Sequence, residues 1–111
     1  FWHQGESEIK EANKLYYERY IKDMQLIFQK FLTTSNRTKI GMALVSVCNS
    51  KKSKYLIDSQ RSIIENNDRV FLTLNTDNLG SGYRYDGCHF NSLGASIIGE
   101  KYASFINKFN K

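Results

Sequence analysis

One uninterrupted apolar run constrains the fold of this chain more than any other feature. Residues 40–47 read Ile-Gly-Met-Ala-Leu-Val-Ser-Val and contain no charged side chain. A strand with one face in water alternates apolar and polar residues, whereas a strand covered on both faces is apolar nearly throughout. The run therefore predicts a strand that is buried on both faces, as in a parallel sheet.

The segments around this strand alternate between helical and extended patterns. Apolar residues recur at helical spacing in residues 8–32, 54–66 and 91–109. Residues 1–2 read as the end of a buried strand, and residues 70–74 as another short strand. The order strand, helix, strand, helix, strand, loop, helix predicts an α/β fold with a parallel sheet and right-handed crossovers.

Composition argues against some classes of partner. The chain has 111 residues, of which 41% are hydrophobic and 14% aromatic, as in a packed globular protein. No apolar run approaches the roughly 18 residues that a membrane helix needs, so we expect no membrane span. The net charge is +5, but the basic residues are spread along the predicted helices and cluster only at residues 51–54. We therefore expect a solvated basic surface and no nucleic-acid partner.

The two cysteines, Cys48 and Cys88, are too few for a disulfide framework or a zinc site. They can pair if the fold brings them together, but buried or idle thiols are the expectation. The two histidines and the scattered carboxylates also lack zinc-like spacing, so we expect no metal.

A long loop, residues 75–90, carries the first candidate functional residues. It has no periodicity and follows the strand at 70–74, and ligands of open parallel sheets bind beyond the carboxyl ends of the strands. Asp86 and His89 lie three residues apart in a turn that contains Gly87, so the carboxylate can reach one ring nitrogen of the imidazole. The other nitrogen can then activate a serine hydroxyl. The alternative is a loop histidine bonded to its neighbour for structural reasons alone.

The turn after residues 1–2 reaches the same edge of the predicted sheet. Gln4 offers a side-chain amide at a strand end, and Gly5 permits close backbone approach. An amide aimed at a developing oxyanion contributes about 3 kcal/mol to a transition state. The alternative is a capping turn that starts the helix at 8–32.

Two tyrosines in the long loop are further candidates. Tyr83 and Tyr85 flank Arg84. Their rings can contact a sugar or another planar group, or they can pack within the loop, and both interpretations stay open.

Several segments resemble a known family. Residues 1–8, Phe-Trp-His-Gln-Gly-Glu-Ser-Glu, resemble the Trp-x-Gln-Gly-Glu-Ser block of the sialate O-acetylesterase-like carbohydrate esterases, a branch of the SGNH hydrolases. Residues 86–91, Asp-Gly-Cys-His-Phe-Asn, resemble their Asp-x-x-His block. Residues 57–60 resemble a helix that carries a recurrent Gln in these proteins. The resemblance spans essentially the whole chain, with the segments in the right order.

The resemblance implies a role for each matching residue. His89 would be the general base, and Asp86 would be its partner. Gln4 and Gly5 would contribute to the oxyanion hole, and Glu6 would order that turn. The family also implies an O-acetylated carbohydrate as substrate and no cofactor.

The family's nucleophile is a serine in a Gly-x-Ser block on its first strand, and no residue of this chain matches it. Ser81 follows the predicted third strand and Ser7 starts a helix, so neither is assigned as the nucleophile. We therefore expect residues 1–111 to be one partial domain, the C-terminal portion of an SGNH-type esterase. It would lack the N-terminal half of its own domain and would be inactive alone.

The family fold is a flavodoxin-like three-layer α/β/α sandwich with a parallel sheet. This chain would hold about three strands and three helices of it. The helices that start near Glu8 and Lys54 would share one face of the sheet, and the terminal helix would cover the other. The implied function is that of a serine-type carbohydrate O-acetylesterase acting on sialic acid or a polysaccharide. The competing hypothesis is a non-catalytic flavodoxin-like module that binds a glycan or a protein.

Overall fold

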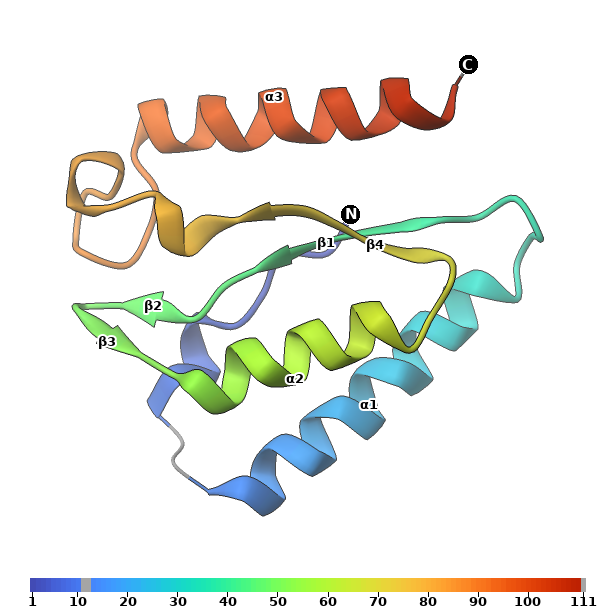
Figure 1. The fold of residues 1–111 in the computed structure, drawn as a ribbon. Coiled ribbons are helices and arrows are strands. Elements are labelled where there is room, and N and C mark those ends of the chain that lie inside the picture. The colour runs from blue at the N-terminus through green and yellow to red at the C-terminus, as the bar shows by residue number, and fades with distance from the viewer. Residues whose placement is uncertain (11–12, 111) are drawn as a thin grey trace.

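The fold is α/β, with a small parallel sheet and three α-helices (Figure 1). The computed structural model describes residues 1–10 and 13–110. Strand β1 (Ile40–Leu44) pairs in parallel with β4 (Val70–Asn75), with Ile40 opposite Val70. A short antiparallel hairpin, β2 (Val47–Cys48) and β3 (Lys51–Lys52), follows β1. The predicted α/β class with a parallel sheet is therefore confirmed.

The N-terminal residues extend this sheet along β1. Trp2 forms a parallel bridge with Met42, in which the Trp2 N–H donates to the Gly41 carbonyl at 2.8 Å. The Ala43 N–H returns a bond to the Trp2 carbonyl at 2.9 Å. Trp2 is thus paired with the sheet, as the sequence predicts, but the predicted burial is wrong at Phe1, which is 57% exposed because no further strand covers it in the described residues.

Strand β1 is buried at all five positions, so the prediction from the apolar run is confirmed there. It ends at Leu44 rather than at residue 47, because the next two backbone N–H groups bind side chains instead of a neighbouring strand. The Val45 N–H donates to Oε1 of Gln60, and the Ser46 N–H donates to a carboxylate oxygen of Asp77, both at 2.9 Å.

Three helices surround the sheet, each preceded by a side-chain cap. They are α1 (Lys14–Leu32), α2 (Lys54–Glu65) and α3 (Ser92–Phe109). Asn13, Ser53 and Asn91 each occupy an extended conformation and accept a backbone N–H from the first turn of the following helix.

The predicted helix at 8–32 is wrong at its start. Glu6–Lys10 form a 3₁₀ helix, η1, and the extended Asn13 begins the α-helix at Lys14. Residues 11–12, which the prediction included, lie outside the described part. Two further 3₁₀ turns, η2 (Thr76–Asn78) and η3 (Ser81–Tyr83), occupy the predicted long loop.

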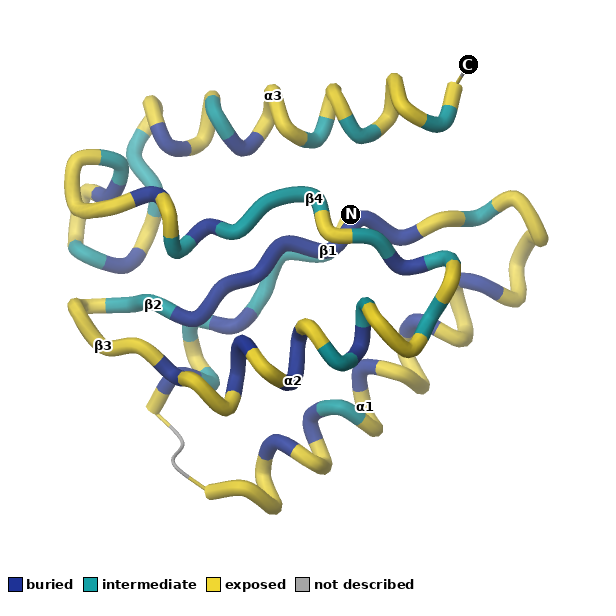
Figure 2. The backbone as a smooth tube through the Cα atoms, in the orientation of Figure 1, coloured by how far each residue is buried: buried dark blue, intermediate teal, exposed yellow. Residues whose placement is uncertain are grey.

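Helices α1 and α2 lie on one face of the sheet, and α3 lies on the other (Figure 1). The main core forms under α1 and α2, where Phe28, Met42 and Leu56 are almost fully buried. In Figure 2 the whole length of β1 is buried while the outer turns of the helices are exposed. Under α3, the ring of Phe1 stacks on Tyr102 at 4.3 Å between centroids.

None of the helices in the described residues combines the length and the apolar character needed to cross a membrane.

Candidate active site

The turn at residues 86–89 brings the predicted carboxylate and imidazole together. Oδ2 of Asp86 lies 2.5 Å from Nδ1 of His89. The other oxygen, Oδ1, accepts the backbone N–H of Cys88 at 2.9 Å and of His89 at 2.6 Å. Gly87, at φ +81°, supplies the left-handed conformation that this turn needs. The carboxylate therefore orients both the ring and the backbone of its partner.

This contact shifts the ionisation of both groups. The hydrogen bond with Asp86, followed by its negative charge, raises the pKa of His89 above its usual 6.5. The hydrogen bonds from His89 lower the pKa of Asp86 to about 2. The His89 side chain is 62% exposed. Because Nδ1 is engaged, Nε2 is the ring nitrogen left to exchange a proton with a ligand.

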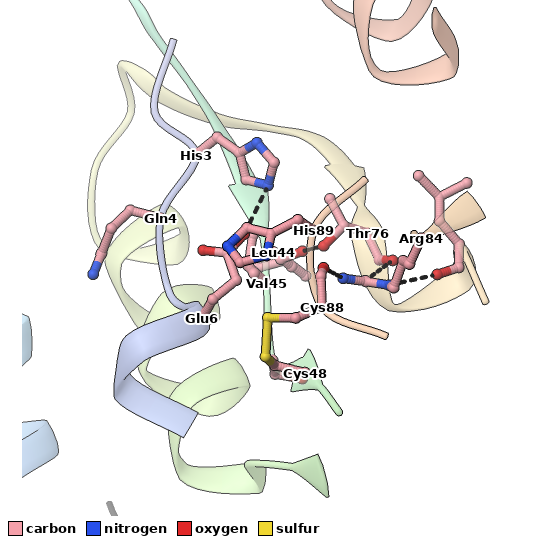
Figure 3. A network of polar contacts seen from close by, with 12 residues as sticks. His3, Gln4, Glu6, Leu44, Val45, Cys48, Thr76, Arg84, Cys88 and His89 are labelled. Atoms are coloured by element: carbon pink, nitrogen blue, oxygen red, sulfur yellow. Dashed lines mark hydrogen bonds and ion pairs between the residues drawn. A yellow bond between two sulfur atoms is a disulfide. The ribbon is translucent and has the colours of Figure 1, made fainter. Parts of the chain in front are cut away.

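A disulfide between Cys48 and Cys88 ties this turn to the β2–β3 hairpin (Figure 3). The expectation of idle thiols is therefore wrong. The reason is the hairpin after β1, which brings the two Cα atoms within 4.3 Å although the residues are 40 apart in sequence. A backbone hydrogen bond from Asn49 N–H to the Gly87 carbonyl, 2.9 Å long, reinforces the same junction.

Arg84 holds the loop from inside. Its side chain is only 7% exposed and donates to the carbonyls of Leu79 at 3.0 Å, Thr76 at 3.1 Å and Cys88 (Figure 3). Its guanidinium also lies 4.2 Å above the ring of Phe90. Burial lowers the pKa of Arg84. Sequence reasoning missed this role, because a buried arginine whose partners are backbone carbonyls leaves no pairing pattern in the sequence.

The Gln4–Gly5 turn is fastened to the end of β1 by Gln60 of α2. The Gln60 side chain is fully buried, and its Nε2 donates to the carbonyls of Gln4 at 3.2 Å and Val45 at 3.3 Å. Gly5 fits only without a side chain, because a Cβ there would lie 2.6 Å from the Val45 carbonyl oxygen. The glutamine that the sequence picks out at position 60 therefore supports the turn.

The Gln4 side chain does not lie next to His89. Its Oε1 accepts a weak hydrogen bond from the Tyr20 hydroxyl at 3.5 Å, and it lines a groove of about 550 Å³ with Trp2 and Met24. In Figure 3 the amide points away from His89. The structure thus brings the backbone of this turn to the sheet edge but turns the predicted amide toward α1.

Glu6 faces the other way, toward the loop. Its Oε1 lies 3.8 Å from Nε2 of His3, whose ring centroid is 5.6 Å from that of Phe90 (Figure 3). Burial, the largest influence, lowers the pKa of His3, and Arg84 acts in the same direction against the charge of Glu6. Glu6 also contributes to the raised pKa of His89. Of the N-terminal candidates, Glu6 is the one whose charge reaches the Asp86–His89 pair.

Comparison with known proteins identifies the family of the chain. A family model described as "Carbohydrate esterase, sialic acid-specific acetylesterase" matches residues 1–108. The chain belongs to this carbohydrate esterase family. The resemblance of residues 1–8 and 86–91 to that family is thereby confirmed. No curated protein and no solved structure matches the chain significantly.

This member of the carbohydrate esterase family has one more buried polar junction that sequence reasoning missed. Asp77, in η2 just beyond β4, accepts hydrogen bonds from both the N–H and the hydroxyl of Ser46. Lys52 of the β2–β3 hairpin lies 3.8 Å from the same carboxylate. Asp77 therefore joins β4 to the hairpin that carries Cys48. The signal that could have found it is a carboxylate at the carboxyl end of a predicted strand.

Within residues 1–10 and 13–110 of this family member, no three His, Cys, Asp or Glu side chains are grouped so that they could hold a metal ion.

Proposed function

We propose that this chain carries the acid–base half of the active site of a serine-type carbohydrate O-acetylesterase. The observation that carries the proposal is the 2.5 Å contact between Asp86 and Nδ1 of His89, in a chain whose family is one of carbohydrate esterases. A carboxylate in this position holds the imidazole in the tautomer that can accept a proton at Nε2.

In the proposed reaction, Nε2 of His89 takes the proton of a serine hydroxyl as that oxygen attacks the acetyl carbonyl of the substrate. Collapse of the tetrahedral intermediate breaks the ester bond, and His89 returns the proton to the departing sugar oxygen. Water, activated by the same imidazole, then attacks the acetyl-serine and releases acetate. Asp86 stabilises the imidazolium in both halves of the cycle.

The serine would come from outside these 111 residues, so the chain alone would be inactive. Gln4 and Gly5 are the proposed oxyanion-hole residues, with Glu6 ordering their turn. Since the Gln4 amide bonds to Tyr20 in this structure, its proposed role includes a change of side-chain rotamer when substrate binds. The long 3.5 Å hydrogen bond is weak enough to be given up in that change.

The chain would form the C-terminal portion of a flavodoxin-like three-layer sandwich. Residues 1–2, β1 and β4 would be three neighbouring strands of its parallel sheet. The parallel bridge between Trp2 and Met42 and the position of α3 across the sheet from α1 and α2 support this assignment (Figure 1). The proposed partner is an O-acetylated carbohydrate, either a sialic acid or a polysaccharide.

Acetate release from an O-acetylated sialic acid tests the proposal in the full-length protein. We expect release by that protein and none by residues 1–111 alone. His89→Ala should abolish release, whereas the control Asp58→Asn should not, since Asp58 forms an exposed ion pair with Lys54 on α2. Release at the parent rate by His89→Ala would refute the assignment. A full-length protein that binds the sugar without releasing acetate would instead be a non-catalytic glycan-binding module.

A further inference from the structure

An exposed aromatic ring stands beside the imidazole of His89. The rings of Tyr85 and His89 are 5.8 Å apart between centroids and only 19° from parallel. Tyr85 is nevertheless 71% exposed, so His89 covers only a small part of its ring. Most of the Tyr85 ring is therefore accessible to a ligand that approaches His89.

The backbone fixes where this ring sits. The Tyr85 N–H donates to the His89 carbonyl at 3.1 Å, and Arg84 and Phe90 form an antiparallel bridge just outside that pair. Tyr85 and His89 therefore face each other across a narrow turn. The disulfide at Cys88 ties this turn to the β2–β3 hairpin. These contacts hold the backbone of Tyr85 next to that of His89, and the bond from Asp86 orients the His89 ring.

The surroundings of the ring are polar. The imidazole of His89 faces the ring, and the carboxylate of Asp86 lies 2.5 Å from Nδ1 of that imidazole. A ligand for this place needs one flat apolar surface the size of a single ring and polar groups around its edge. The C–H face of a pyranose with its rim of hydroxyls has that chemistry, whereas a lipid chain or an apolar peptide does not.

We propose that Tyr85 is a stacking platform for the sugar ring of the substrate and directs its acetyl ester toward His89. This inference rests on the proposed esterase function, since it takes His89 as the reacting base. Tyr85 thus selects acetylated sugars over acetyl esters that lack a ring.

The test compares two substrates in the full-length protein: the methyl glycoside of an O-acetylated sialic acid, and ethyl acetate, which has no ring. In Tyr85→Leu, the ratio of kcat/KM for the sugar ester to kcat/KM for ethyl acetate should fall about tenfold, the scale of one aromatic stacking contact. Tyr85→Phe should keep the ratio within about twofold, because the ring is retained. Tyr55→Leu is the matched control, since Tyr55 is a half-exposed tyrosine on α2, 51% exposed and stacked on Tyr17.

An equal loss on both substrates in Tyr85→Leu would overturn the inference, because Tyr85 would then act only by orienting His89. An unchanged ratio would overturn it as well. Binding of the deacetylated methyl glycoside, measured by NMR titration, separates this inference from the proposed function. If the full-length protein releases no acetate, a loss of sugar affinity of about tenfold in Tyr85→Leu would still support the platform, and unchanged affinity would remove it.

Discussion

Both oxygens of Asp86 bind His89, one at the ring nitrogen Nδ1, 2.5 Å away, and the other at the backbone N–H, 2.6 Å away. The imidazole is therefore oriented within a single four-residue turn. Most side chains of an active site are aligned by elements that are distant in sequence. The alignment of this pair depends only on the turn itself and on the contacts that hold the turn, which are the Cys48–Cys88 disulfide and the hydrogen bonds of Arg84.

The first prediction concerns Asp86→Asn. The amide keeps the shape of the carboxylate but cannot stabilise an imidazolium and favours the wrong ring tautomer, so kcat/KM for the acetylated sugar should fall roughly 10²- to 10⁴-fold. The measurement is acetate release by the full-length protein, with Asp58→Asn as the control. Parent activity in Asp86→Asn would mean that the carboxylate has only a structural role.

The second prediction is the pH dependence of His89. Its raised pKa means that the neutral form, which can accept a proton, dominates only above a midpoint higher than 6.5. The rate should therefore rise with pH through that midpoint, and Asp86→Asn should move the midpoint down. NMR titration of the His89 ring in residues 1–111 measures this value without any turnover. A midpoint at or below 6.5 in the parent chain would contradict the geometry.

The second prediction extends to stability, because the same pair makes the free energy of unfolding depend on pH, in opposite directions for His89 and Asp86. His89 has a raised pKa, so its contribution is fully present below the unfolded value of 6.5 and is lost as the pH rises through the folded value. Asp86 has a lowered pKa, so its contribution is present above 3.8 and is lost as the pH falls toward about 2. Unfolding by urea across this range should show that the stabilisation by the pair is greatest between these two unfolded values and is absent in Asp86→Asn.

The third prediction concerns Gly5. An added methyl group would lie 2.6 Å from the Val45 carbonyl oxygen, at φ +157°, where side chains are rarely tolerated. Gly5→Ala should reduce the free energy of unfolding by about 2 kcal/mol, measured with urea. Gly80→Ala is the matched control, because nothing lies within 4 Å of a Cβ at that position. Equal stability of the two variants would show that the turn relaxes around the added methyl group.

The fourth prediction concerns the disulfide. Cys48→Ser should lower the free energy of unfolding by about 3 kcal/mol and speed amide hydrogen exchange at residues 85–89, because the link then no longer constrains the unfolded chain or the turn. A reducing agent should have the same effect on the parent protein. The double variant Cys48→Ser/Cys88→Ser should not respond to the reducing agent, and any response would point to a different cause.

The fifth prediction concerns Arg84. Arg84→Met keeps much of the side-chain volume but leaves three carbonyl oxygens without a charged donor, so it should cost roughly 2–4 kcal/mol of stability. Arg61→Met, at an exposed position on α2, is the control and should change stability by less than about 0.5 kcal/mol. A loss in Arg84→Met no larger than that of the control would show that the loop is held by its other contacts.

The parts of this protein that the sequence predicts are those decided locally. The burial of β1 follows from an apolar run, and the contact of Asp86 with His89 follows from a spacing of three residues around Gly87. The ends of α2 and α3 lie within one residue of their predicted positions, because polar caps mark them.

The parts that the sequence misses depend on segments brought together by the fold. Cys48 lies next to Cys88 only because a hairpin follows β1. Arg84 binds backbone carbonyls, which every residue has, so no residue type in the sequence marks its partners. The amide of Gln4 turns toward α1, where its oxygen accepts a hydrogen bond from the Tyr20 hydroxyl, a contact that the spacing of the two residues does not predict. Such choices are made by competing contacts rather than by spacing along the chain.

The covalent link at Cys88 also bears on how the protein is handled. Disulfides persist in oxidising surroundings and are reduced by glutathione. A preparation from the cytoplasm of an expression host would therefore contain molecules with and without the Cys48–Cys88 bond. Batches would then differ in specific activity for a reason unrelated to purity. The free thiols of each batch should therefore be assayed whenever a rate is measured on this protein.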